Sequence, residues 1–326
     1  MVVRSGVASL IPEDASREII MATLNQCAAM QLMRKTTMKQ KQKRLPILET
    51  LPDQADFLPN DTSLKPISEM TWTNKFLNAE PIGTIVFIPE DVVDDIAETG
   101  GGDIWEQIKP LVAEDIARKL DNAIFFGVGA PATWPTAIVP AAIAAGNTVN
   151  LGAGGAGSDS FADINTAMMT VEADGYDVNG FWARQQFKGT IRNERDANRG
   201  FLYPPNGPAN VGAANNPANG QGVLFGEKLV FSKAGLSGFS TASGNAHLIT
   251  GDFQQALFAT RKQLEWKVLD QATLYNTDGS VRIALAQQDA LAIRVFGRFA
   301  WQVPNPINRM QPTEASRYPF AVVRQP

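Results

Sequence analysis

The residue types that most often carry chemistry at enzyme and metal sites are scarce in this sequence. It contains one histidine, His247, and one cysteine, Cys27. A zinc site takes three or four protein ligands, so no Cys/His cluster can be assembled within one chain. His247 lies in the 245–249 run, whose pattern is typical of the start of a strand. We therefore interpret it as a hydrogen-bonded structural histidine and not as a catalytic base.

Acidic pairs and a glycine-rich run are the other candidates for chemistry. Asp94-Asp95 and Glu114-Asp115 are adjacent carboxylates, but neighbours along a helix point in different directions. The 151–157 run lacks the Lys-Ser/Thr ending of a phosphate-binding loop, and no strand–turn–helix unit surrounds it. Solvated surface carboxylates and a surface loop are the better explanations. We expect no catalytic site, no metal and no cofactor.

The composition is that of a folded, water-soluble protein. Of 326 residues, 44% are hydrophobic and 19% are charged, which argues against wholesale disorder. The net charge of −4 argues against a chain that wraps polyanions as a whole. No run approaches the length of a membrane span, and the N-terminus lacks a signal-peptide pattern. With a single cysteine and hence no internal disulfide, we expect synthesis in a reducing cytoplasm.

The N-terminal part of the chain predicts a helix, a basic run and an extended segment. Pro12, Glu13 and Asp14 form a helix-start pattern for residues 11–33, and recurring prolines favour an extended segment over residues 45–61. Between them lies a run of cations without an acid. It could bind nucleic acid, bind an acidic neighbouring subunit or remain a solvated arm, and these alternatives stay open. The cations are Arg34, Lys35, Lys39, Lys41, Lys43 and Arg44.

Residues 62–90 predict a two-stranded excursion. One strand runs through residues 70–77, and a return strand follows over residues 82–88, closed by Pro89. An isolated hairpin of this kind is poorly stable in water. We therefore expect its apolar surface to lie on another surface.

The middle of the chain predicts two helices. Six aliphatic residues recur every fourth position from Ile104 to Ile124, which indicates an amphipathic helix. Because Pro110 interrupts this stripe, we expect the main helix to begin near Pro110, after a short helical turn, and to end at Gly127. A second helix is predicted from Phe161 to the Asp174-Gly175 turn.

The last part of the chain predicts loops and strands. Residues 131–160 and 204–222 have loop compositions. Residues 181–183, 248–252 and 283–286 have strand patterns, 291–296 fits a helix or a strand, and 253–258 is ambiguous. From Pro304 onward we expect a proline-punctuated tail.

The order of these parts resembles the major capsid proteins of tailed phages that share the Hong Kong 97 fold. The similar runs follow one another from about residue 8 to residue 310, each loose by itself but informative in its order. They are Ile-Pro-Glu-Asp-Ala-Ser-Arg-Glu-Ile-Ile at 11–20, Leu64-Lys65-Pro66 with Met70-Thr71-Trp72 and Asn74-Lys75, the 85–95 run, Leu-Asp-Asn-Ala-Ile-Phe-Phe-Gly at 120–127, the 224–230 run with Lys228 where proline is usual, and Gly251-Asp252-Phe253 followed by 290–301.

The resemblance implies an α+β fold with an N-terminal arm, an extended E-loop hairpin, a P-domain with a long spine helix and antiparallel strands, and an A-domain. The implied division is arm 1–50, E-loop 51–90, spine helix 91–130, A-domain 131–260, P-domain strands 261–303 and C-terminal tail 304–326. The arm and hairpin carry apolar residues without an obvious partner in the chain, so neighbouring copies are expected to cover them.

The function that the resemblance implies is that of a major capsid protein. Pentamers and hexamers of the chain would form an icosahedral shell around double-stranded DNA, bound non-specifically. Portal and scaffolding or decoration proteins are expected partners, and assembly is expected in the bacterial host cytoplasm. The E-loop residues expected at subunit contacts are Lys65, Trp72, Lys75 and Phe76.

Some members of this family cross-link covalently through an E-loop lysine, an asparagine and a glutamate. Lys65 matches the lysine, but Asp289 stands where the asparagine is expected and Phe296 where the glutamate is expected. An aspartate cannot release ammonia to form the isopeptide bond, and Phe296 cannot act as a base. We therefore expect a non-covalent shell in which Lys65 makes a polar contact between subunits.

Three rival functions remain to be separated from this interpretation. An encapsulin-like bacterial nanocompartment would have the same fold but package enzyme instead of DNA. A soluble hydrolase would need converging carboxylates, which the adjacent acidic pairs do not supply. A tail or decoration protein would be expected to lack a spine helix between an E-loop and the closing strands.

Overall fold

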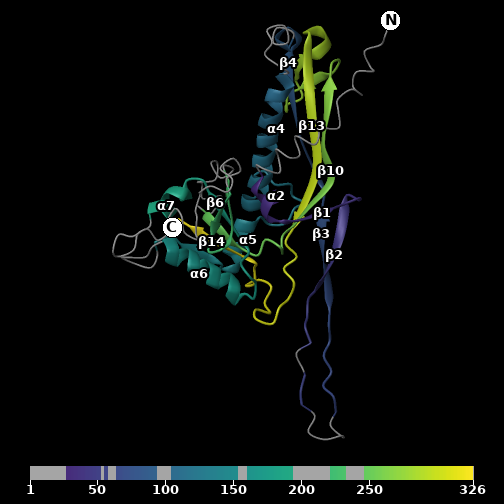
Figure 1. Cartoon of the computed structure of the whole chain (residues 1–326). Helices are drawn as coiled ribbons and strands as arrows, with labels where there is room; N and C mark the ends of the chain where they lie inside the picture. Colours follow the sequence, from purple (N-terminus) through teal and green to yellow (C-terminus); the bar gives the residue numbers. More distant parts are fainter. Residues whose placement is uncertain are drawn as a thin grey trace.

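Two sheets, a long helix and a projecting hairpin make up the protein in the computed structural model (Figure 1). The structure describes residues 27–52, 55–57, 64–93, 104–152, 160–193, 221–232 and 246–325. Residues 11–26 of the helix expected over 11–33, the Asp94-Asp95 pair, residues 153–157 of the glycine-rich run and residues 204–220 lie outside these ranges. The expectation of a loop over residues 131–160 is wrong for its middle, because Ile138–Ala145 forms a helix and Thr148–Asn150 a strand. Within them, no helix is long and apolar enough to cross a membrane.

A four-stranded sheet forms the elongated part of the molecule. Its strand order is β1(Arg34–Thr37), β10(Leu257–Leu269), β13(Ala290–Gln302) and β4(Glu80–Pro89). β13 is antiparallel to β10 and β4, whereas β1 runs parallel to β10. The 291–296 run is therefore strand, and part of the ambiguous 253–258 run begins β10. The local sequence of 291–296 fits a helix and a strand equally well, and pairing with strands on both sides of β13 makes it a strand.

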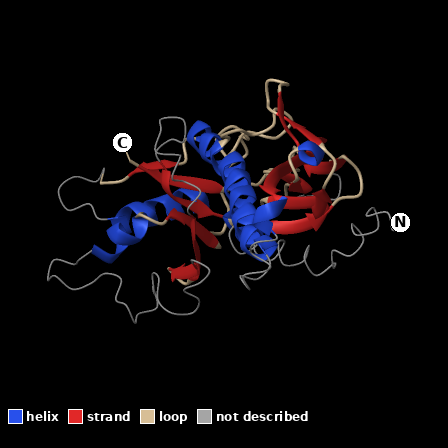
Figure 2. Ribbon diagram, turned by 90° about the horizontal axis from the view of Figure 1, so that it is seen from above, coloured by secondary structure: helices blue, strands red, loops and turns tan. Residues whose placement is uncertain are grey.

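The spine helix α4(Ile104–Asp121) lies between the two sheets, as Figure 2 shows. The expectation that the main helix begins near Pro110 is wrong, because α4 continues through this proline from Ile104. Packing of the Val112, Ile116 and Leu120 stripe, all buried, outweighs the hydrogen bond that a proline removes from a helix. The predicted end is confirmed: a π-helical turn, Asn122–Phe126, stops at Gly127, whose φ of 75° favours glycine.

A six-stranded sheet forms the second lobe. Its order is β5(Thr148–Asn150), β14(Phe320–Arg324), β9(Ala246–Gly251), β6(Gly180–Arg184), β8(Glu227–Ser232) and β7(Gln221–Leu224). The helices α5(Ile138–Ala145), α6(Ser160–Ala173) and α7(Phe187–Asn193) accompany this sheet. The second predicted helix and the strand core at 181–183 are confirmed by α6 and β6.

The expectation of a C-terminal tail is wrong for its last residues. β14 lies inside the six-stranded sheet, between β9 and β5. Its residues Phe320 to Val323 are all 0% exposed. A short continuous apolar run is the pattern of a strand buried on both faces, and the prolines before it obscured that signal.

The projecting hairpin has different strands from those expected. β3(Trp72–Asn78) pairs with β2(Gln42–Leu48) over seven residues, whereas β4 pairs with β13. The return strand predicted at 82–88 is therefore a strand of the four-stranded sheet, and 42–48 takes its place in the hairpin. β3 and β4 are separated only by Ala79, so that nearly continuous strand changes partners between the hairpin and the sheet. Pattern predicts that each segment is a strand but not which partner it finds.

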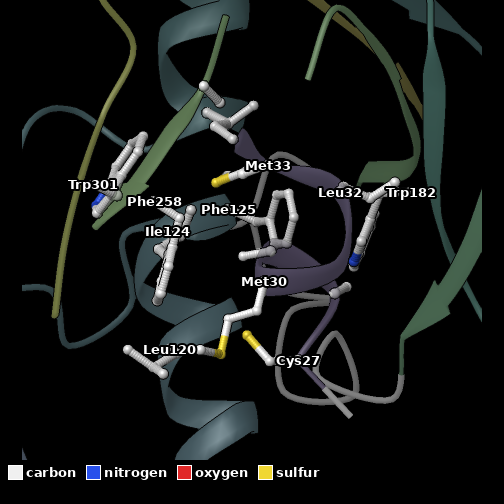
Figure 3. Close-up of a cluster of buried hydrophobic side chains, with 14 of the residues drawn as sticks. Cys27, Met30, Leu32, Met33, Leu120, Ile124, Phe125, Trp182, Phe258 and Trp301 are labelled. Atoms are coloured by element: carbon white, nitrogen blue, oxygen red, sulfur yellow. The ribbon is translucent and has the colours of Figure 1, made fainter. Parts of the chain in front are cut away.

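The core joins the N-terminal helix to both sheets. α2(Ala28–Leu32) lies among buried residues of the spine helix end, β6, β10 and β13, as the labelled side chains in Figure 3 show. Met30, Phe125, Trp182 and Phe258 are at most 5% exposed in this cluster. A small ribbon of β11(Thr273–Tyr275) and β12(Val281–Ala284) has its own cluster with Phe87 and Ala292.

Candidate subunit-contact surfaces

The outward side of the hairpin carries exposed aromatic side chains. Side chains alternate along a strand, and the pairs Arg44↔Phe76 and Leu48↔Trp72 place residues of both strands on one side. Trp72 is 63% exposed and Phe76 is 41% exposed. We call this side the hairpin outer face; it consists of Arg44, Pro46, Leu48, Trp72, Asn74 and Phe76. Large apolar side chains exposed together mark a surface that another molecule covers.

The opposite side of the hairpin packs on the protein's own sheet. Leu77 and Ala79 form a buried cluster with Met38, Ala259 and Ala300, and Leu45 packs against it. The hairpin root is therefore anchored by its inner side, which leaves the outer face turned away from the sheet.

Hydrogen bonds hold the hairpin root in place. Trp134 donates its Nε1–H to the Asn78 carbonyl at 3.1 Å, and Asn78 donates its side-chain amide to the Thr133 carbonyl at 2.9 Å. Gln302 donates its side-chain amide to the Phe76 carbonyl at 3.1 Å. Lys75 forms an ion pair with Glu314, Nζ to Oε1 2.9 Å. Lys75 thus has a partner within its own chain that sequence reasoning missed, because Glu314 is far away along the chain.

Beyond the root, the hairpin is acidic and apolar. We call the described residues 49–52, 55–57 and 64–71 the hairpin tip. Phe57, Leu64 and Ile67 are 96%, 93% and 86% exposed, and Lys65 is also exposed. Along the sequence, residues 49–71 contain five acids, Glu49, Asp53, Asp56, Asp61 and Glu69, but only one base, Lys65. The subunit contacts expected for Lys65, Trp72, Lys75 and Phe76 remain predictions.

The basic run does not form one patch. Arg34 and Lys35 are neighbours on β1, and Lys43 and Arg44 are neighbours on β2. Within each pair, the two side chains point to opposite sides of the strand, because side chains alternate along it. Lys39 and Lys41 lie between the two strands, and all six cations are exposed. Lys35 lies near Lys228, whose pKa is lowered first by burial and then by the charge of Lys35. Contact of the run with DNA or an acidic subunit remains a prediction.

A buried carboxylate joins the N-terminal segment to the spine helix. Asp121 accepts hydrogen bonds from the backbone N–H groups of Ala28 and Ala29 at 2.9 and 3.0 Å. The Cys27 thiol donates to the same carboxylate at 3.1 Å, and the Ser232 hydroxyl lies 3.4 Å away. Sequence reasoning missed this site, because nothing in the pattern separates Asp121 from the solvated acids of the same helix.

Burial of Asp121 makes this junction sensitive to pH. Burial raises the pKa of its carboxyl from 3.8 to about 6, although the N–H groups of Ala29 and Ala28 and the Cys27 thiol act in the opposite direction. Burial also raises the pKa of the Cys27 thiol, which therefore stays protonated at neutral pH.

We predict that Asp121 lowers the stability of the folded chain as pH rises from about 4 to 7. In this pH range the folded state keeps the Asp121 proton, whereas the unfolded state loses it. The stabilising contribution of this proton is fully present below the unfolded pKa and is lost as the pH rises through the folded pKa. The free energy of unfolding changes by about 3 kcal/mol as a result. In urea unfolding, the free energy of unfolding of Asp121→Asn should rise by this amount relative to that of the unsubstituted protein as the pH goes from about 4 to 7. Asp115→Asn, exposed on the same helix, is the control, and parallel pH curves for Asp121→Asn would contradict the prediction.

Glu114, Asp115 and His247, which were considered for chemistry, lie within the described ranges. Glu114 and Asp115 are exposed on α4, where Asp115 forms an ion pair with Arg118 at 3.0 Å. His247 lies in β9, with Nε2 3.4 Å from the side-chain oxygen of Gln325. In the described ranges, no three His, Cys, Asp or Glu residues gather as metal ligands.

The residues at the expected cross-link positions are an aspartate and a phenylalanine, and Glu265 on β10 is the residue that pairs with Phe296. Asp289 is exposed in the turn before β13, with φ 43°. Phe296 lies in β13, with the Arg298 guanidinium 5.5 Å and the Lys262 ammonium 5.7 Å from its ring centre. The phenyl ring itself supplies no base for amide formation, and the neighbouring Glu265 carboxylate forms an ion pair with Lys262 at 2.7 Å.

Comparison with known proteins places this fold among capsids. A solved structure from Microbacterium phage Oxtober96 is 33% identical with a TM-score of 0.74, covering 92% of this chain and 91% of that chain. One from Mycobacterium phage Bobi is 29% identical with a TM-score of 0.75, covering 100% and 99%. A capsid of an empty GTA particle shares the fold at 15% identity, with a TM-score of 0.58 over 93% and 89% of the chains. No curated protein sequence matched.

The mixed helix-and-strand architecture is that of the Hong Kong 97 type of capsid protein, as the resemblance predicted. The sequence profile of the phage capsid family matches residues 8–307. The chain belongs to this family and is a major capsid protein of an icosahedral bacteriophage virion. It is therefore a capsid shell protein.

Proposed function

We propose that this chain forms pentamers and hexamers that close into an icosahedral shell around double-stranded DNA, without covalent cross-links and without enzymatic activity. The observation that carries the proposal is the hairpin: its root is packed on its own sheet, while the outer face and the tip carry large exposed apolar side chains. A neighbouring copy that covers these side chains would remove them from water. Head-to-tail contacts of this kind close into rings.

Electron microscopy of the purified chain tests the shell directly. We expect closed particles built from five-fold and six-fold rings, and particles from infected cells should contain DNA and not a packaged enzyme. On a denaturing gel, intact particles should run as a single band of the monomer mass. A ladder of covalent multimers would disprove non-covalent assembly, and a chain that stays monomeric under all conditions would disprove the shell.

The hairpin outer face provides a mutational prediction. Trp72→Ser with Phe76→Ser should lower the fraction of chain in particles by more than about tenfold, because burying one large aromatic side chain contributes about 1.5–3 kcal/mol. Sedimentation measures the assembled fraction. The melting temperature should change little, because both side chains are exposed in the single chain. Met169→Ser, exposed on α6, is the control, and equal assembly of both variants would refute the role of this face.

The proposed partners besides other copies are packaged DNA, a portal and scaffolding or decoration proteins, with assembly in the host cytoplasm. The mild net charge of −4 supports weak, non-specific contact with DNA, since strong contact requires many cations at the phosphates. Replacing the six cations of the 34–44 run with glutamine tests whether they contribute. Unchanged assembly and genome retention would exclude both the DNA contact and the acidic-subunit contact for this run.

A further inference from the structure

A pocket with an apolar interior and a basic rim lies beside the end of β1. It has a volume of ≈ 390 Å³ and is lined by Met30, Met38, Leu264 and Phe299, with Lys35 and Arg261 among the polar lining residues. We call it the arm pocket. The four apolar residues belong to the protein core or its edge and are at most 5% exposed, so a group that enters the pocket contacts core side chains.

The strand geometry explains why the pocket is open at this place. The register of β1 with β10 ends at Thr37↔Thr260. The pairing of β10 with β13 shifts between Thr260 and Lys262, and Arg261 lies in this irregularity. A bulge re-aims the side chain that it contains. Within the described part of the chain, Lys35 and Arg261 form no ion pair with an acid.

The hairpin tip has the complementary chemistry. Phe57 is 96% exposed, which is an extreme value for an aromatic side chain. Asp56 precedes it, and its carboxylate accepts a hydrogen bond from the backbone N–H of Phe57 at 2.8 Å. Along the sequence, residues 49–71 have five acids and one base. An aromatic group beside a carboxylate fits an apolar pocket with cations at its rim.

The two surfaces cannot meet within one chain. In Figure 1 the hairpin extends away from the body, and its tip is at the far end from β1 and β10. A second copy is therefore the source of the tip. Nucleic acid fits less well, because phosphates would engage the two cations but leave the apolar interior uncovered.

We propose that the arm pocket receives Asp56 and Phe57 from the hairpin tip of a second copy, with the Phe57 ring inside the pocket and the Asp56 carboxylate at Lys35 and Arg261. This inference rests on the proposed shell function, and it names the partner surface of the tip. It also assigns Lys35 of the basic run to contact with an acidic subunit.

Charge exchange tests the pairing. Arg261→Glu and Asp56→Arg should each lower the assembled fraction by about tenfold or more, since close charge pairs at interfaces couple by more than 1 kcal/mol. The double variant should recover most of the loss. Arg294→Glu, an exposed cation on β13 of the same sheet, is the matched control. Single variants that assemble like Arg294→Glu, or a double variant no better than either single one, overturn the proposal; so does loss of DNA retention without loss of assembly.

Cysteine pairing gives a second readout that does not depend on a loss. Thr37 lies at the pocket and is exposed, and Ala55 is an exposed residue beside Asp56 and Phe57 in the tip. Mild oxidation of particles carrying Thr37→Cys and Ala55→Cys should give disulfide-linked multimers on a non-reducing gel, because each chain links to the next. Ala55→Cys with Met169→Cys is the control. Particles that form but give no more multimers than the control overturn the pocket contact and leave the shell intact, whereas absence of particles from the unsubstituted chain overturns the shell itself.

Discussion

Trp182→Ala is expected to destabilise the folded chain by about 3–5 kcal/mol, the range for removing a buried aromatic side chain. Trp182 is 0% exposed on β6, and its ring centre lies 5.2 Å from Phe125 and 5.4 Å from Phe126. It therefore joins the six-stranded sheet to the end of the spine helix (Figure 3). Its Nε1–H has no hydrogen-bond partner among the described residues, so the loss measures packing and the cavity left behind. Urea unfolding followed by tryptophan fluorescence or circular dichroism measures the difference.

Trp72→Ala is the matched control, because it removes the same side chain from a position that is 63% exposed. Its folding free energy should stay within about 1 kcal/mol of the unsubstituted chain. Trp182→Phe should cost less than Trp182→Ala, since it keeps a ring next to Phe125 and removes an unpaired N–H. Equal destabilisation by the two alanine variants would contradict the role of Trp182 in joining the lobes.

Gly251→Val is expected to separate β14 from β9. A Cβ at Gly251 would lie 2.2 Å from the Pro319 carbonyl oxygen and 2.9 Å from the Phe320 Cα, where the register pairs Gly251 with Phe320. Both neighbours are backbone atoms, which cannot turn aside as a flexible side chain can. Overpacking of this kind costs about 1–3 kcal/mol or more, and here it also breaks the hydrogen bonds of a central strand.

Hydrogen exchange and limited proteolysis of the C-terminal strand measure this effect. The amides of residues 320–324 should lose protection in Gly251→Val before those of the four-stranded sheet do. Gly189→Ala is the control, because it lies in α7 and a Cβ there meets no atom within 4 Å. Gly189→Ala should be neutral or slightly stabilising. Unchanged protection of β14 in Gly251→Val would show that the two strands can move apart without loss.

Local patterns predicted the elements that carry one dominant signal. The stripe of Val112, Ile116 and Leu120 predicted the buried face of the spine helix, and Gly127 predicted its end. These predictions succeed because helical hydrogen bonds are local and the buried face repeats with the helical period. The extent of α4 through Pro110 was not predictable, because packing against two sheets outweighs one lost hydrogen bond.

Strand partners were predicted less well. The sequence marks residues 42–48, 72–78 and 82–88 as extended or apolar, but it does not state that the first pairs with the second. It gives the last residues, 320–324, no visible role, although they occupy the middle of a sheet. Each strand satisfies its hydrogen bonds with residues far away along the chain, so its position depends on the whole fold.

The candidate sites divide in the same way. The contact role of Trp72 and Phe76, expected from their type and from a hairpin that needs cover, stays a prediction, whereas the pairing of Lys75 with Glu314 was not predictable. The arm pocket joins residues that are far apart along the chain, and only the pairing of β1 with β10 brings Lys35 and Arg261 to the same pocket.

By itself, the sequence determined the scarcity of catalytic residues, the spine helix, the apolar hairpin and the resemblance to capsid proteins, because composition, helical period and the order of motifs are properties of the chain. The tertiary structure decided which strands pair and which face of the hairpin stays uncovered. It also decided that Asp121 is buried and accepts a hydrogen bond from the Cys27 thiol. Burial and pairing arise from contacts between distant segments, and these exist only after the chain has folded.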